Sequence, residues 1–411
     1  MSAAPVYVLG GHQTDFAQRW GSGSDGLFDV LSATVTGAVA DADLPIGDIE
    51  VAHVGNLAGE LFAGQAQLGG LVASIDPALA TIPTSRHEAA CASGSVAVLS
   101  AMADIEAGRY DVALVTGVEV MRTASSRDAA AYLGSAAWVG REATDATWPW
   151  PAMFSRIADA YADRYGLDHD HLTRIAEVNL TNAQHNPLAQ TRDWTLDPSS
   201  FCLDDTLNPV VEGRLRKHDC GRITDGGATV VLASARYAAE HARRHGGNIA
   251  DLAVIEGWGH RTAPMLLEDK LARSAEAEYV FPHMRLAIEE AYSRAGISGV
   301  DDLDAVETHD CFTITEYAAL DHLGVTPPGK SGQAVEDGTI DADGRLPVNP
   351  SGGLIGLGHP VGATGVRMLH DAARQVTGQA GECQVEGARR VATLNIGGSF
   401  TTVVSLVVGR G

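Results

Sequence analysis

SRHEAACASGS, residues 85–95, is the stretch from which the organisation of this chain can be worked out. An apolar run at 78–82 precedes it and predicts a buried strand, and apolar side chains recur at helical spacing over 96–105. Gly108 then supplies a stop signal for the helix. Cys91 is therefore expected where a strand ends and a helix begins.

A cysteine at such a junction has two interpretations. The unpaired N–H groups and the dipole of a helix N-terminus favour negative charge, which would stabilise the thiolate of Cys91. The small neighbours over 92–95 also leave room for a bulky substrate. A lone cysteine among alanines is, however, more often an inert buried side chain. The choice between the two depends on the rest of the chain.

The chain has 411 residues, of which 45% are hydrophobic and 20% charged, as expected for a globular protein of two or three domains. Its net charge of -23 argues against nucleic acid or an anionic membrane as the main partner, because both bind basic surfaces. The five cysteines form no close pairs, which argues for a reducing compartment. Residues 1–5 show no secretory signal and no apolar window is long enough to span a bilayer, so we expect a cytoplasmic protein.

Alternating strands and helices predict an α/β fold with a mostly parallel sheet. In the first half, the expected strands cover 6–9, 50–54 and 112–116, and the expected helices cover 27–40 and 61–73. In the second half, the strands cover 252–258, 304–307, 391–394 and 402–408, and the helices cover 284–295, 315–323 and 363–376. Each half places a loop with a reactive side chain before a helix, so the second half repeats the pattern of the first.

Between the two halves the character of the sequence changes. Helical segments at 155–165 and 171–185 stand among tryptophan-proline and aspartate-proline pairs, and the next expected strand is at 228–233. We therefore expect an N-terminal half formed by residues 1–117 and 223–247, an inserted loop domain at 118–222, and a C-terminal half at 248–411.

Three further loops carry polar or glycine-rich sequence. H-D-C-F at 309–312 follows an expected strand, where an α/β sheet usually presents its chemistry. N-P-S-G-G-L-I-G-L-G-H-P at 349–360 leads into a helix, and its His359 stands between glycine and proline, where a core histidine is not expected. N-I-G-G-S at 395–399 joins the two closing strands, and its glycines let backbone N–H groups approach a ligand. With Cys91 these make four candidate active-site loops.

Over nearly its whole length the chain resembles the thiolase superfamily, through C-A-S at 91–93, N-P-S-G-G-L-I-G-L-G-H-P-V-G-A-T-G at 349–365 and N-I-G-G at 395–398. Most thiolases carry N-E-A-F where this chain has H-D-C-F, and Cys-x-Gly where it has Asn395-Ile396-Gly397. Both departures match the thiolases related to the sterol-carrier-protein-linked enzyme. The resemblance implies the thiolase fold: two similar βαβαβ halves that form a five-layered α/β/α/β/α core with an inserted loop domain.

The resemblance also implies catalytic roles. Cys91 would attack a 3-oxoacyl-CoA after passing its proton to His359. Backbone N–H groups of Cys91 and Gly397 would stabilise the oxyanion, each contributing about 3 kcal/mol to lowering the barrier. His309 would hold the enolate oxygen together with His359.

The closing loop lacks the cysteine that most thiolases use there. Asn395 cannot exchange a proton, and we expect it mainly to hydrogen-bond its own loop. The resemblance implies that Cys311 supplies the missing acid and base from another loop, although a small buried hydrophobic role is the alternative. Cys202 and Cys383 have no supporting context. A second His-Asp-Cys, at 218–220, is expected to be structural.

Coenzyme A brings phosphates, and this acidic chain offers few cations for them. The densest basic cluster of the loop domain consists of Arg214, Arg216 and Lys217, with His218 and Arg222 alongside. The cluster is a candidate for binding CoA, although a basic run is usually a solvated face.

We expect no metal and no permanently bound cofactor, with coenzyme A and acyl-CoA as substrates. A zinc site built from His309, Cys311 and His359 is conceivable, but no paired Cys-x-x-Cys spacing supports it.

These patterns favour an acetyl-CoA C-acyltransferase of lipid metabolism, such as fatty-acid or sterol side-chain degradation. It would cleave 3-oxoacyl-CoA to acetyl-CoA and a shortened acyl-CoA, or run the reverse Claisen condensation, through an acyl-Cys91 intermediate. A homodimer or homotetramer is expected. A decarboxylating condensing enzyme would use two histidines and one cysteine, so Cys311 argues against it. Two alternatives stay open: a thiolase-fold aldolase subunit with a small partner protein, and a non-catalytic CoA-binding scaffold in a partner complex.

Overall fold

In the computed structural model, which describes residues 4–411, nine strands form one sheet in the order β3-β2-β4-β7-β1-β8-β11-β10-β9. Their bounds are β1 Val6–Gln13, β2 Val51–Gly55, β3 Thr84–His87, β4 Val112–Glu119, β7 Gly226–Ser234, β8 Ala253–Thr262, β9 Ala305–Thr308, β10 Arg390–Gly397 and β11 Thr402–Arg410. β1 and β8 pair over only three residues each, so the sheet consists of two half-sheets joined along this seam.

The two half-sheets repeat one topology. The order β2-β4-β7-β1 corresponds to β9-β10-β11-β8, and in both the first pairing is parallel and the next two are antiparallel. An isolated parallel bridge between Val306 and Val348 takes the place that β3 holds beside β2. The predicted repeat is confirmed. The prediction of a mostly parallel sheet is wrong, because β7 and β11 each run against their two neighbours and the two halves meet antiparallel.

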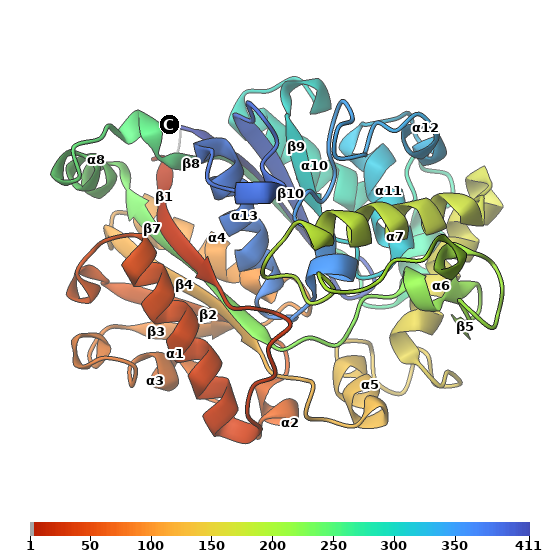
Figure 1. Cartoon of the computed structure of the whole chain (residues 1–411), viewed down its shortest axis with the longest axis horizontal. Coiled ribbons are helices and arrows are strands. Elements are labelled where there is room, and N and C mark those ends of the chain that lie inside the picture. The colour runs from red at the N-terminus through yellow and green to blue at the C-terminus, as the bar shows by residue number, and fades with distance from the viewer. Residues whose placement is uncertain (1–3) are drawn as a thin grey trace.

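Helices separate and cover the half-sheets in five layers (Figure 1). α4 (Ser93–Glu106) and α13 (Thr364–Thr377) lie between the half-sheets and share one apolar core with both. α1 (Gly23–Asp41) and α3 (Leu68–Val72) cover the outer face of the first half-sheet. α10 (Pro282–Ala295) and α11 (Thr313–Leu323) cover the outer face of the second. The α/β/α/β/α fold predicted from the resemblance is therefore present.

Two local predictions on the approach to Cys91 are wrong. Residues 78–82 are not a strand, because Asp76 caps a short 3₁₀ turn at Pro77–Leu79 and the strand begins only at Thr84, where β2 offers a partner. The helix expected over 61–73 is two short helices, α2 (Gly59–Phe62) and α3. Gly64 and Gln67 break it, since both adopt a positive φ.

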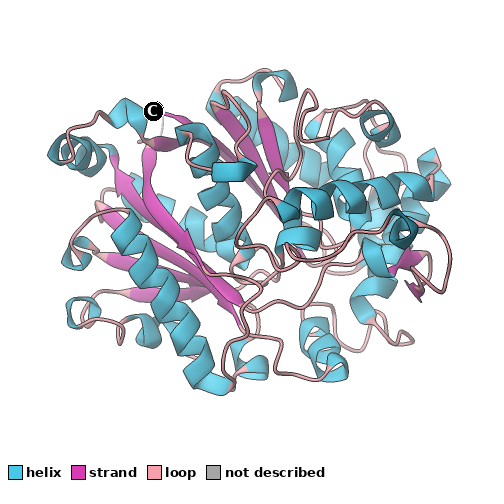
Figure 2. Ribbon diagram, in the orientation of Figure 1, coloured by secondary structure: helices cyan, strands magenta, loops and turns pink. Residues whose placement is uncertain are grey.

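The chain between β4 and β7 forms a separate layer of helices beside the second half-sheet (Figure 2). Its elements are α5 Ser126–Gly134, α6 Pro149–Tyr165, α7 His169–Gln184 and the small hairpin β5 Val210–Glu212 with β6 Leu215–Arg216. α6 and α7 pack against α11 and bury Phe154, Ile157 and Tyr161 in the same core as the second half-sheet. The remaining helices are α8 Ala235–Arg244, α9 Leu267–Arg273 and α12 Ser331–Glu336. Within residues 4–411, no helix has the length and apolar character needed to cross a membrane.

Candidate active site

Cys91 lies in the short turn between β3 and α4, as the sequence predicts. The preceding residue, Ala90, has a φ of 51°, a left-handed conformation that a non-glycine residue rarely adopts. The backbone N–H groups of Cys91 itself and of Gly398, which lines the same cavity, lie near the sulfur of Cys91 and lower its pKa. Two N–H groups that converge on one atom are the arrangement that stabilises a developing negative charge.

The expected stabilisation of the Cys91 thiolate by the helix N-terminus is outweighed by burial. Burial raises the pKa of this thiol to about 12, and the carboxylates of Glu119 and Glu88 raise it further, against the two N–H groups that lower it. The resting cysteine is therefore a neutral thiol, and its attack on a substrate requires a base.

Glycine packing brings the Cys91 helix and the His359 loop together. A Cβ added at Gly94 would lie 2.8 Å from the carbonyl oxygen of Gly362, and one at Gly117 would overlap the same oxygen. Because neither position tolerates a side chain, the N-terminus of α4 and the loop before α13 can meet over the end of β4.

His359 ends the glycine-rich loop and is held in one tautomer. The hydroxyl of Thr364 donates its proton to the carbonyl of Pro360 (3.1 Å), so it can only accept at 2.7 Å from Nδ1–H of His359. Nε2 is then the unprotonated nitrogen, and it is buried without a hydrogen-bond partner among residues 4–411. Burial lowers the pKa of this imidazole to about 3, so His359 presents a neutral acceptor nitrogen.

His309 is held in the opposite tautomer. The amide nitrogen of Asn395 donates to Nδ1 of His309 at 3.1 Å, which leaves the proton on Nε2. The amide oxygen of Asn395 accepts from the Ser95 hydroxyl at 2.8 Å. The sequence predicted that Asn395 mainly hydrogen-bonds its own loop. In the structure it does more, because it links that loop to the Cys91 helix and to His309. Burial lowers the pKa of His309, and His359 lowers it further.

The three groups are in close contact. One potential ligand atom from each of Cys91, His309 and His359 lies within 4.8 Å of the others, and the two imidazole rings meet edge to face with centroids 5.4 Å apart. Such a set offers three donors to a metal ion, one fewer than the four ligands of a structural zinc site. That no metal binds here stays a prediction.

Cys311 comes from the loop between β9 and α11 and faces the cavity that Cys91 lines. Its sulfur is buried and lies 3.8 Å from the Thr315 hydroxyl. Burial raises the pKa of this thiol well above its usual range, and Cys91, which lines the same cavity, raises it further. The tertiary structure thus brings the two predicted cysteines to one site.

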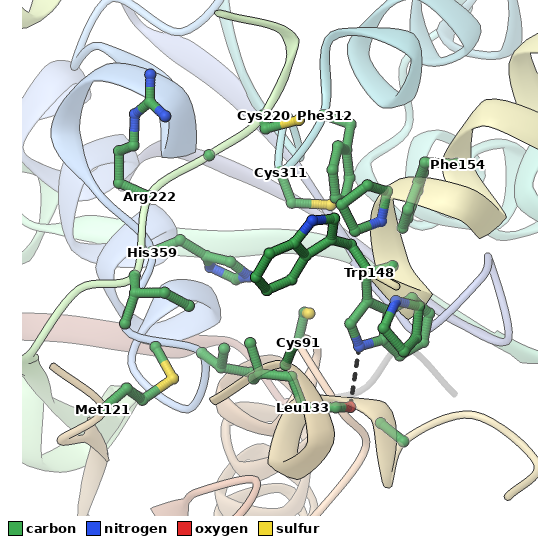
Figure 3. A pocket seen from close by; sticks show the side chains of 18 of the residues that line it. Cys91, Met121, Leu133, Trp148, Phe154, Cys220, Arg222, Cys311, Phe312 and His359 are labelled. Atoms are coloured by element: carbon green, nitrogen blue, oxygen red, sulfur yellow. Dashed lines mark hydrogen bonds between the residues drawn. The ribbon is translucent and has the colours of Figure 1, made fainter. Parts of the chain in front are cut away.

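An apolar cavity of about 370 Å³ opens above these residues (Figure 3). Cys91, Cys311 and His359 point into it, and the indole of Trp148 projects between them. Phe312 stacks on Phe154 at 4.4 Å, and both rings line the wall. The other apolar lining residues include Leu57, Met121, Leu133, Trp150 and Val361. The apolar lining favours a substrate with an apolar chain, whose reactive carbon would lie next to the sulfurs of Cys91 and Cys311.

The proposed phosphate-binding cluster does not line this cavity. Arg214 pairs with Asp159 and Arg216 with Asp205, each at 2.7 Å, and Lys217 is exposed. Arg222 does line the cavity, and its guanidinium lies 5.4 Å from the ring of Trp194. Burial lowers the pKa of Arg222, and no carboxylate among residues 4–411 pairs with it.

The second His-Asp-Cys motif contributes its cysteine to the wall of the cavity. Cys220 lines it and forms a bridge with Phe312, and its thiol donates to the carbonyl of Arg216 at 3.3 Å. His218 points elsewhere and bonds Asn208. Cys202 and Cys383 do not line this cavity.

Buried carboxylates that the sequence did not single out fix the site loops. Asp310 accepts from the backbone N–H groups of Leu354 and Ile355 and so holds the glycine-rich loop against the His309 loop. Glu119, at the end of β4, accepts from the backbone N–H of Gly362 at 3.1 Å and from the backbone N–H groups of Leu57 and Ala58. Burial raises the pKa of Asp310 to about 6 and that of Glu119 to about 7. Their only sequence signal is an acidic residue at the end of an apolar strand.

Sequence models of the thiolase N-terminal domain and of the thiolase C-terminal domain-like region match residues 6–194 and 267–410. The chain belongs to the thiolase family. It is 32% identical over 409 residues to an acetyl-CoA acetyltransferase of Methanothermobacter thermautotrophicus, covering 98% of this chain and 99% of that protein. It is 33% identical to one of Methanocaldococcus jannaschii, covering 97% of each. Rat sterol carrier protein 2 is 27% identical, and the match covers 98% of this chain and 71% of that protein.

Solved structures show the same fold. An Ltp2-ChsH2(DUF35) aldolase superposes with a TM-score of 0.78 at 22% identity, covering 100% of this chain and 99% of that one. An acetyl-CoA acetyltransferase from Syntrophomonas wolfei superposes with a TM-score of 0.68 at 17% identity, covering 99% of each.

Proposed function

We propose that this thiolase transfers acyl groups between CoA thioesters through Cys91, cleaving a 3-oxoacyl-CoA by thiolysis or forming it by the reverse condensation. The observation that carries the proposal is the convergence of two thiols and one unprotonated imidazole nitrogen on a single apolar cavity. Acyl transfer needs a nucleophile, a base that takes its proton, and a separate acid for the α-carbon.

The first half-reaction begins at Cys91. Its proton passes to Nε2 of His359 while the sulfur attacks the 3-oxo carbon of the substrate. Because the resting thiol has a raised pKa and the imidazole a lowered one, the transfer is coupled to the attack. We assign the oxyanion, which forms on the carbon that bonds the sulfur, to the backbone N–H groups of Cys91 and Gly398, because both lie near that sulfur. Gly397, which the resemblance assigns to this role, lies one residue earlier and packs against the Ala89 carbonyl.

Collapse of this intermediate breaks the bond between the α-carbon and the 3-oxo carbon. The acyl group stays on Cys91, and the electron pair passes to the enolate of the departing thioester. Nε2–H of His309 and the newly protonated Nε2 of His359 donate to the enolate oxygen. The thiol of Cys311 protonates the α-carbon, since Asn395 has no exchangeable acid in the needed range. Cys311 then takes the proton of incoming coenzyme A, whose sulfur attacks acyl-Cys91, and Cys91 recovers its proton from His359.

Arg222 is the cation that we assign to the coenzyme. It lines the cavity, and no carboxylate in the described range 4–411 pairs with it, whereas Arg214 and Arg216 are already paired. A desolvated guanidinium binds phosphate oxygens in a bidentate manner. The cavity wall formed by Trp148, Phe154 and Phe312 would hold the acyl chain.

One alternative has a specific observation in its favour. The Ltp2-ChsH2(DUF35) aldolase has the same fold, and its name joins two components, Ltp2 and ChsH2(DUF35). An aldolase subunit or a CoA-binding scaffold that works with a small partner protein would not need acyl-Cys91. The expected homodimer or homotetramer, and a place in lipid metabolism, stay predictions.

Incubation with acetoacetyl-CoA and coenzyme A, followed by loss of substrate and by intact mass, tests the proposal. We expect turnover with an acetyl adduct in the wild type and neither in Cys91→Ala. Cys311→Ala should keep the adduct but not turn over, and Cys383→Ala, which lies away from the cavity, should behave as the wild type. Absence of an adduct with this and longer 3-oxoacyl-CoAs would refute acyl transfer and favour the aldolase or the scaffold.

A further inference from the structure

A lysine buried beneath the closing loop has no part in the chemistry proposed above. Lys270 lies on α9 with 4% of its surface exposed. Its ammonium donates to the hydroxyl of Ser399 at 2.9 Å, to the hydroxyl of Thr401 at 2.8 Å and to the carbonyl of Met265 at 3.0 Å. All three donors are used, and none of the acceptors is charged. Among residues 4–411, no carboxylate forms an ion pair with it.

Burying a cation without a carboxylate partner costs desolvation free energy, which lowers the stability of the fold. Burial lowers the pKa of Lys270 to about 8, while the nearby Glu142 raises it. A methionine of similar length would fill the same space without the desolvation penalty of the charge. The two side-chain acceptors both belong to the turn between β10 and β11, which indicates what the ammonium holds.

That turn has a strained backbone. Gly398 and Phe400 have φ values of 63° and 61°, and a phenylalanine in this region is an outlier. Phe400 is held by stacking on Phe281, with ring centroids 4.0 Å apart, and by Nε2–H of His283, which donates to its carbonyl at 2.7 Å. Lys270 hydrogen-bonds the residues on either side of Phe400, Ser399 and Thr401. The turn is therefore held by three side chains, those of Phe281, His283 and Lys270.

The hold of Lys270 on this turn matters because the turn carries a backbone N–H group that lies beside Cys91. Gly398, next to Ser399, lines the same cavity as Cys91, and its backbone N–H lies near enough to the Cys91 sulfur to lower the pKa of that thiol. We propose that Lys270 is a positioning residue: by fixing Ser399 and Thr401 it aims the Gly398 N–H at Cys91 and so sets the reactivity of that thiol. Its contribution to acyl transfer rests on the proposed function, but its effect on the Cys91 thiol does not.

The test therefore uses the free enzyme and no substrate. The rate at which iodoacetamide alkylates Cys91 is measured from pH 7 to 10 by peptide mass spectrometry, in the wild type, Lys270→Met and Lys270→Gln. Lys330→Met is the matched control, since Lys330 is exposed and its ammonium pairs with no group within residues 4–411. Alkylation of Cys383 in the same samples monitors general accessibility, and thermal unfolding monitors the fold.

Loss of one hydrogen bond to a thiolate corresponds to about a tenfold fall in its population. We expect Cys91 alkylation at a given pH to slow about tenfold in Lys270→Met and less in Lys270→Gln, which keeps an amide donor. Lys330→Met and the Cys383 rate should not change. If Lys270→Met does not fold, Ser399→Ala removes one of the acceptors and should slow Cys91 several-fold. Unchanged Cys91 alkylation in a folded Lys270→Met, or in Ser399→Ala, would overturn the proposal even if acyl transfer is confirmed.

Discussion

Replacing Asn395 by aspartate would exchange one donor for an acceptor in a buried site of unchanged shape. The amide nitrogen now donates to Nδ1 of His309 at 3.1 Å and thereby keeps the proton on Nε2. A carboxylate oxygen in its place would accept from Nδ1–H, so that the neutral imidazole would lose the proton on Nε2. The Ser95 hydroxyl would keep an acceptor, and we expect the variant to fold.

The loss can be stated as a free energy. One donor to an oxyanion or enolate oxygen contributes about 3 kcal/mol, which is about 10²-fold in rate. We therefore expect kcat for cleavage of acetoacetyl-CoA to fall about 10²-fold in Asn395→Asp, while KM stays within a few-fold. Asn395→Ala should instead lose stability as well, by about 1–3 kcal/mol for each of the two buried groups left without a partner.

Ser95→Ala provides the control. It breaks the other hydrogen bond of the same amide, at 2.8 Å, without changing the donor to His309. It should lower the midpoint of thermal unfolding but leave kcat nearly intact. A folded Asn395→Asp enzyme with kcat within threefold of the wild type would show that the His309 tautomer does not control the enolate step.

Two further predictions concern the cavity. Arg222→Ala should raise KM for CoA substrates about tenfold with little change in kcat, because the unpaired guanidinium at the cavity is lost, whereas Arg216→Ala removes a cation already paired with Asp205 and should leave KM unchanged. Steady-state kinetics of the two variants measures this difference. A raised KM in Arg216→Ala with an unchanged KM in Arg222→Ala would instead favour the basic cluster at 214–217 as the phosphate site. Burial lowers the pKa of His359 to about 3, and protonation would remove its basic nitrogen, so kcat/KM should show no acid limb near pH 6.5 and should persist down to about pH 5. A tenfold fall between pH 7 and 5.5 with an apparent pKa near 6.5 would contradict this.

Much of the fold follows from local sequence. Apolar periodicity sets many strand and helix positions, and the structure confirms strands such as β4 and helices such as α13. On the approach to Cys91 it fails, because a capped turn and two residues of positive φ interrupt the pattern. Strand direction is different, because a buried strand has the same composition in either direction. β7 and β11 run against their neighbours for reasons that lie in the connections between strands.

The sequence by itself determined the candidate catalytic side chains. Cys91, His309, Cys311 and His359 each stand in a short loop beside a strand or helix end, and the structure gathers them at one cavity. The tertiary structure alone decided their protonation and orientation. The thiol of Cys91 is neutral because it is buried, against the local effect of its helix.

The opposite tautomers of the two histidines depend on contacts that no local pattern encodes. His359 is fixed by Thr364, five residues away, but His309 is fixed by Asn395, 86 residues away. Likewise Arg222, and not the denser basic cluster at 214–217, lines the cavity. The arginines of that cluster, on and beside the hairpin of β5 and β6, pair instead with Asp159 and Asp205. Composition and spacing determine which groups a chain contains, whereas burial and long-range packing determine the charge and hydrogen-bonding state in which each group acts.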